Sequence, residues 1–63
     1  MSIFSILIDI RKEKKISIID MSGYLGIDRR SVYNYEKGIR KVPLSVVEGY
    51  AERFGYELRL MIK

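Results

Sequence analysis

The sequence predicts a small, mainly α-helical domain in which four helices are followed by one short β-strand. Apolar residues recur at intervals of three and four between residues 2 and 54, which is the spacing of one helix face. Residues that favour helix starts, and glycines that favour helix ends, divide this stretch into four segments. Residues 56–63 alternate between apolar and polar side chains, which is typical of a strand. We therefore expect residues 1–63 to form one domain, with a helical bundle over 2–54 and a strand over 56–63.

Composition limits the ways in which so short a chain can be stabilised. The sequence has 63 residues, 48% of them hydrophobic, and contains no cysteine and no histidine. Disulfides, thiolate metal sites and the usual zinc ligands are therefore excluded, which leaves association with a second chain as the expected reinforcement. The apolar stretch over residues 1–10 is too short for a membrane helix, and its positive charges follow it rather than precede it. We expect a soluble, unprocessed cytoplasmic protein that uses no metal or cofactor and contacts no membrane.

The positive charge is unevenly distributed along the chain. Residues 1–41 carry nine Lys or Arg against five Asp or Glu, whereas residues 42–63 carry three of each. The whole excess of four positive charges thus lies in the first two thirds, which suggests a face directed at a polyanion. An ordinary solvated surface with a basic bias is the alternative.

The first helix is expected over residues 2–14, with Ile3, Leu7 and Ile10 on its inner face and the polar run RKEKK at its end. Further apolar side chains on this helix exceed one stripe, which suggests that it is covered on more than one side or meets a partner. These are Phe4, Ile6 and Ile8.

The second helix begins after Ser17, because Ser17 and Asp20 have the Ser-x-x-Asp spacing of a capping box. Its inner positions are Met21 and Leu25, and Gly26 ends it because glycine readily adopts positive φ.

The third helix lies within residues 28–37, with Asp28 as its N-cap and Gly38 as its terminator. Val32 and Tyr35 mark its inner face. The outer side chains are Arg29, Arg30, Tyr33 and Asn34.

Pro43 suits the first turn of the fourth helix, because the N–H that proline lacks has no partner there. Gly55 ends this helix, whose inner positions are Leu44, Val47, Ala51 and Phe54. In the strand that follows, one face consists of Tyr56, Leu58, Leu60 and Ile62. A lone strand leaves its backbone polar groups unpaired, so we expect two copies to pair these strands across a dimer. Pairing with a strand over residues 2–6 of the same chain is the alternative.

The second and third segments have the features of two short helices joined by a tight turn. Ser22 is small enough for a helix crossing, Gly26 tolerates the turn, and Val32 would hold the third helix against the second. With these residues, and with the stretch YLGIDRRSVYNYEKGIRKVP, the chain resembles the Cro/repressor (Xre) family of helix-turn-helix proteins over about residues 3–54.

The resemblance implies roles for particular residues. The core would comprise Ile3, Leu7, Ile10, Ile16, Met21, Leu25, Ile27, Val32, Tyr35, Val47 and Phe54. DNA bases would be contacted by Arg29, Arg30, Tyr33 and Asn34. DNA phosphates would be contacted by Lys15, Ser17, Ile18, Arg40 and Lys41. Arg11 and Glu36 match a salt bridge that ties the first helix to the third.

Two positions depart from the family's pattern. Ile18 stands where glutamine often contacts phosphate, although the helix N-terminus there still offers N–H groups. Asp28 stands where serine or threonine is common, and its charge is unfavourable near a phosphate.

Several functions are open to such a chain, and the first is a sequence-specific transcription regulator, a repressor, that binds double-stranded DNA as a homodimer. Arg29 or Arg30 would bind guanine, Asn34 suits adenine, and helix 28–37 would enter the major groove. The alternative is a protein-binding helix-turn-helix module, or an antitoxin subunit whose main partner is a toxin or another regulator. Without histidine or cysteine, no nucleophile–base pair is apparent, so an enzyme is not expected.

Overall fold

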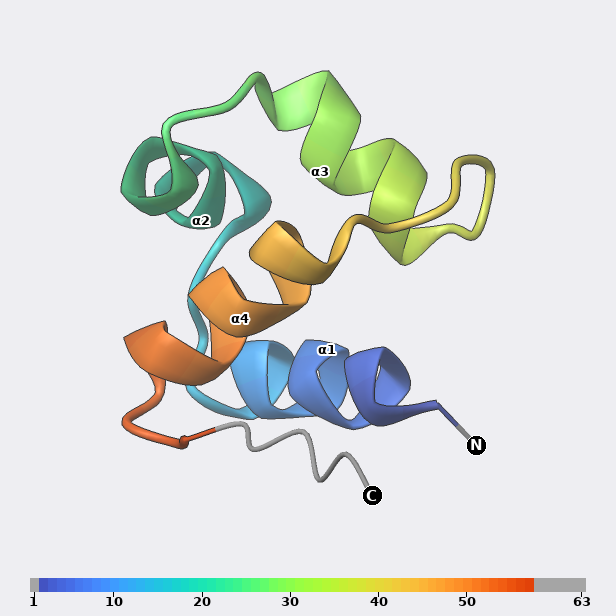
Figure 1. Ribbon diagram of the computed structural model, residues 1–63. Coiled ribbons are helices and arrows are strands. Elements are labelled where there is room, and N and C mark those ends of the chain that lie inside the picture. The colour runs from blue at the N-terminus through green and yellow to red at the C-terminus, as the bar shows by residue number, and fades with distance from the viewer. Residues whose placement is uncertain (1, 58–63) are drawn as a thin grey trace.

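The computed structural model describes residues 2–57 and contains four α-helices, shown in Figure 1. They are α1 (Ile3–Glu13), α2 (Ile18–Leu25), α3 (Arg29–Glu36) and α4 (Leu44–Arg53). Each predicted helical segment is therefore present, with ends that agree to within one or two residues. The model places α4 across α1, while the N-terminal end of α3 lies far from α1 (Figure 1).

The ends of α2 form as the sequence predicts. The Ser17 hydroxyl accepts a hydrogen bond from the Asp20 N–H at 3.0 Å, which satisfies one of the N–H groups without an intrahelical partner. Gly26 has φ of 71° and donates its N–H to the Ser22 carbonyl at 2.8 Å. The chain can therefore turn sharply into α3.

The other two predicted caps need correction. Asp28 occupies the N-cap position of α3, but its side chain makes no capping hydrogen bond. Pro43 precedes α4 as its N-cap instead of lying within the first turn. Proline suits this position too, because its fixed φ is compatible with the extended backbone observed there.

The core lies where all four helices meet. Its buried hydrophobic residues are Phe4, Leu7, Met21, Val32, Val46, Val47, Tyr50 and Ala51. The Phe4 and Tyr50 rings pack edge to face with centroids 4.9 Å apart, an arrangement that aromatic pairs favour. Six further predicted core residues are partly buried against this cluster: Ile10, Ile16, Leu25, Ile27, Tyr35 and Phe54.

Two predicted core positions are wrong, because Ile3 and Leu44 are each 52% exposed. Each is the first residue of its helix, where fewer neighbouring elements cover it. In α1 the buried side chains are Phe4, Leu7 and Arg11, so the inner face is shifted from the predicted one. Phe4 therefore belongs to the core and is not available to a partner.

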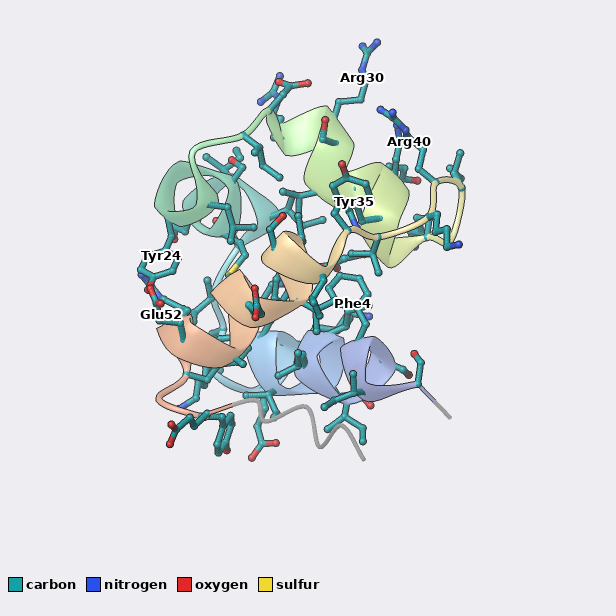
Figure 2. All side chains as sticks on the ribbon, viewed as in Figure 1. Phe4, Tyr24, Arg30, Tyr35, Arg40 and Glu52 are labelled. Carbon is teal, nitrogen blue, oxygen red and sulfur yellow. The ribbon has the colours of Figure 1, made fainter. Side chains whose placement is uncertain are left out.

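The helices α2 and α4 approach each other closely. A Cβ atom on Gly49 would lie 2.3 Å from Cδ2 of Leu25, so a larger residue there would force Leu25 to move. At the far end of the contact the Tyr24 hydroxyl donates to the Glu52 carboxylate at 2.9 Å (Figure 2). These contacts fix α2, and with it the start of α3, on the helical core.

The predicted strand begins at the end of the described part. Tyr56 is 53% exposed, and no strand is present within residues 2–57. Leu58, Leu60 and Ile62 lie outside the described residues. The alternative strand over residues 2–6 is wrong, because α1 already begins at Ile3. Within residues 2–57 no helix is long and apolar enough to cross a membrane.

Candidate nucleic-acid interface

The helix α3 is anchored by one side and displays the other. Val32 is fully buried, whereas Arg29, Arg30 and Tyr33 are exposed and Asn34 is half-buried. This separation follows from the helical period, because Arg30 lies two residues before Val32 and so on nearly the opposite side of the helix, while Val32 is held by the core. In Figure 2 the Arg30 side chain extends away from the rest of the molecule. The predicted base-contacting residues therefore share the outer side of one exposed helix.

The two arginines lie at an unusual place for cations. Both belong to the first turn of α3, where the helix dipole is positive and disfavours positive side chains. Within residues 2–57 the salt bridge between Arg11 and Glu36 is the only one, so neither Arg29 nor Arg30 has a carboxylate partner. Their guanidinium groups can therefore bind an external anion or a hydrogen-bond acceptor.

A hollow of about 370 Å³ separates the start of α2 from α3. It is lined by Ile18, Ile19, Arg29, Arg30 and Tyr33. Ile19 is 60% exposed and Tyr33 46% exposed, so apolar carbon faces solvent beside the two arginines. From the sequence, Ile18 was expected near phosphate, whereas Ile19 was not expected to line the same surface.

A second, smaller hollow of about 210 Å³ lies on the other side of Ile18 and Tyr33, between α1 and the end of α3. Lys12 and Lys37 contribute cations to its lining. The Lys37 ammonium also lies 5.6 Å from the centre of the Tyr33 ring, within cation–π range. Neither lysine was predicted from the sequence as a site residue, although the spacing of four between Tyr33 and Lys37 places these two on one helix face and so pointed to Lys37.

The end of α3 is tied to α1 by a buried ion pair. Arg11 donates from Nε to Oε2 of Glu36 at 2.7 Å and from Nη2 to Oε1 at 2.8 Å, a two-point contact. Its Nη1 donates to the Ile16 carbonyl at 2.6 Å. The side chains of Arg11 and Glu36 are only 8% and 6% exposed, so this is the interhelical pair that the resemblance implied, in buried form.

Tyr50 completes this cluster from α4. Its hydroxyl donates to Oε2 of Glu36 at 2.5 Å. Burial raises the pKa of Tyr50, and the hydrogen bond to the Glu36 carboxylate raises it further, so the phenol stays protonated as a donor. Side chains of α1 and α4 thus hold one carboxylate of α3, which fixes the orientation of that helix.

The predicted phosphate-contacting residues lie on two segments that flank α3. Lys15 and Ser17 lie at the turn between α1 and α2, where the Ser17 hydroxyl is already used as a cap. Arg40 and Lys41 are exposed in the loop after α3, which is tied to that helix because the Asn34 carbonyl accepts the Arg40 N–H at 3.3 Å. The side chains of Arg30 and Arg40 both point outward in Figure 2.

Lys15 is the one non-glycine residue with positive φ, at 58°, among residues 2–57. A side chain in this left-handed region costs about 1–2 kcal/mol, which glycine avoids. Glycine relieves this strain but also raises the conformational entropy of the unfolded chain, which offsets part of the gain. We therefore expect Lys15→Gly to raise the free energy of unfolding by about 0.5–1 kcal/mol. Urea unfolding followed by circular dichroism measures this change.

Lys14→Gly is the matched control for that substitution, because Lys14 has φ of −80° in the right-handed region. It removes the same charge without relieving strain, and it is expected to destabilise the fold by about 0.5–1 kcal/mol. Equal losses for the two variants would contradict the strain at Lys15.

Comparisons with known proteins agree with this architecture. The family model described as Helix-turn-helix matches residues 7–61. A protein of Saccharolobus islandicus and one of Saccharolobus solfataricus are each 40% identical over 48 residues, 76% of this chain. One of Sulfolobus acidocaldarius is 44% identical over the same length. All three carry the provisional name HTH-type transcriptional regulatory protein.

The matched segment is a small part of these relatives, 16% of their length. No solved structure matches the chain significantly. The family match nevertheless spans most of the chain, including all of α2, α3 and α4. The chain belongs to the Cro/C1-type helix-turn-helix family.

Proposed function

We propose that this chain is a transcriptional repressor that binds a specific sequence of double-stranded DNA as a homodimer, with α3 in the major groove. The observation that carries the proposal is the pair of arginines, Arg29 and Arg30, on the exposed side of α3 without a carboxylate partner. Arginine donates two parallel hydrogen bonds to guanine O6 and N7, and Asn34 has the groups that pair with adenine.

The flanking basic residues support the same orientation. Lys15 precedes α2, and Arg40 and Lys41 follow α3, so cations lie on both sides of the recognition helix. The first N–H groups of α2, at Ser17 and Ile18, lie beside a positive dipole end that suits a phosphate. Phosphate contacts of this kind set the position of the protein on DNA, whereas contacts to bases choose the sequence.

Salt dependence of DNA binding tests the proposal. With Lys15, Arg40 and Lys41 on phosphates in each half of a dimer, log K is expected to fall with log salt concentration with a slope of about −5. Fluorescence anisotropy with a labelled duplex between 50 and 200 mM salt, roughly the range over which such losses are measured, gives the slope. Absence of binding at the lowest salt, or a slope near zero, would contradict a DNA-binding function.

The homodimer rests on the sequence of the tail and on the apolar face of α1. Ile3, Ile6, Leu7, Ile10 and Tyr56 line a hollow of about 400 Å³ on that face. Ile3 and Tyr56 are each more than half exposed. An exposed apolar surface that continues into an alternating apolar tail is suited to contact with a second copy.

Light scattering at micromolar concentration is expected to give the mass of a dimer for the parent chain. Leu60→Glu puts a charge on the predicted apolar face of the tail and should give a folded monomer. Met61→Glu, on the opposite face of the alternating pattern, is the matched control and should leave the dimer intact. A folded parent monomer would refute the dimer.

The same apolar face of α1 favours a second candidate, a module whose main partner is another protein. If this candidate is right, DNA binding with a steep salt dependence is absent, while the exposed apolar face still binds another protein. The salt titration therefore discriminates between the two functions directly.

A further inference from the structure

We infer that the hollow between α2 and α3 receives the 5-methyl group of a thymine next to the base that Arg29 or Arg30 contacts. The inference rests on the proposed DNA-binding function and adds a specificity determinant to it. Ile18, Ile19 and Tyr33 would then distinguish thymine from cytosine, although neither isoleucine can form a side-chain hydrogen bond.

The hollow between α2 and α3 combines apolar and charged side chains. It is lined by Ile18, Ile19 and Tyr33, here called its floor, and by the two arginines Arg29 and Arg30, here called its rim. Cations beside exposed carbon are unsuited to the apolar surface of another protein, because covering them would remove two unpaired charges from water. The rim therefore favours a polyanion, and the floor must be covered by an apolar group of that same ligand.

In the major groove, DNA offers one apolar group to such a floor. That group is the 5-methyl of thymine, and all other groups on the major-groove edges of the base pairs are hydrogen-bond donors or acceptors. The hollow has a volume of about 370 Å³, ample for a methyl group. Apolar side chains in contact with this methyl are a recognised means of distinguishing thymine from cytosine.

The floor of the hollow lies beside the start of the recognition helix. Arg29, Arg30 and Tyr33 belong to the first two turns of α3, and Ile18 and Ile19 are the first two residues of α2. A base contacted by an arginine of α3 would therefore have its neighbour beside the start of α2. The juxtaposition predicts that guanine and thymine are preferred at adjacent positions of each half-site.

Replacement of thymine by deoxyuridine tests the inference, because it removes the methyl group and keeps every hydrogen-bonding group. A duplex is first selected from a pool of random sequences with the full chain. Each thymine is then replaced by deoxyuridine in both half-sites, and affinity is measured by fluorescence anisotropy. At one position, the replacement in both half-sites is expected to weaken binding about 15-fold, which is about fourfold for the buried methyl group of each half-site.

The protein side of the test uses Ile19→Ala, because a side chain that is 60% exposed can be shortened without loss of the core. This variant should bind the thymine and deoxyuridine duplexes alike. Leu44→Ala is the matched control, since Leu44 is 52% exposed and is the first residue of α4, away from the hollow's lining. Leu44→Ala should keep the parent's ratio of affinities for the thymine and deoxyuridine duplexes. Circular dichroism should show both variants folded.

The outcomes separate the inference from the function on which it rests. If a duplex is selected but deoxyuridine is tolerated at every position, or if Ile19→Ala keeps the parent's ratio, the methyl contact is wrong and DNA binding stands. If no duplex is enriched above the random pool, the proposed function fails and the inference fails with it.

Discussion

Glu36→Leu is expected to lower the free energy of unfolding by about 3–5 kcal/mol, because it leaves the Arg11 guanidinium buried without its carboxylate. Two hydrogen bonds from Arg11 and one from Tyr50 end on this carboxylate, so the substitution strands donors on two other helices. Small domains have total stabilities of roughly 5 kcal/mol, so this loss is close to the whole. Urea unfolding followed by circular dichroism measures it.

A double variant tests whether the loss comes from a stranded charge or from lost packing. Arg11→Met with Glu36→Leu replaces both charged groups by apolar ones of similar size, and it should recover a large part of the stability. Tyr50→Phe removes one donor and keeps the ring that packs on Phe4, so it should cost only about 1–2 kcal/mol. Additive losses of a few tenths of a kcal/mol for the two single variants would contradict the buried pair.

Local signals in the sequence were sufficient for the helices. The helix α2 begins at the Ser17 cap and ends at Gly26, which has positive φ, as predicted. Both signals could be recognised because capping and left-handed geometry depend on residues within one turn. Asp28 shows the limit of that reasoning. Its residue type favours an N-cap hydrogen bond, yet the side chain makes none.

The inner face of α1 was harder to predict. Ile3, Leu7 and Ile10 and the observed set Phe4, Leu7 and Arg11 both have helical spacing, and the two differ by a small rotation about the helix axis. The choice is made by α4, whose Tyr50 ring packs against Phe4, and by Glu36, which pairs with Arg11. A periodic pattern within one segment contains neither of these distant contacts.

The candidate interface has the same character. The outer positions of α3 follow from the period of that helix and the burial of Val32, so Arg29 and Arg30 could be predicted as exposed. The hollow that places Ile19 beside Tyr33 joins residues 14 positions apart, through the angle between α2 and α3. That angle depends on the packed core. The family resemblance implied two helices joined by a tight turn, but not which side chains meet between them.

Substitution of the recognition residues is expected to separate sequence-specific from non-specific DNA binding. Arg29→Ala, Arg30→Ala and Asn34→Ala should each weaken binding to the selected duplex by about 1–3 kcal/mol per half-site, because each removes a hydrogen-bonding group from a base edge. Affinity for duplexes of unrelated sequence should change much less. Electrophoretic mobility or anisotropy titrations with both kinds of duplex measure the two affinities at one fixed salt concentration.

Lys41→Ala serves as the contrasting variant, because a lysine on phosphate contributes equally to every sequence. It should weaken selected and unrelated duplexes alike and reduce the salt slope by roughly one unit per half-site. Arg53→Ala is the control for net charge, since Arg53 packs over the Tyr24 ring, and Tyr24 lies far from Arg30 in Figure 2. Arg53→Ala should leave the ratio of the affinities for selected and unrelated duplexes unchanged. If Arg29, Arg30 and Asn34 behave in the same way as Arg53, α3 is not the helix that reads the major groove.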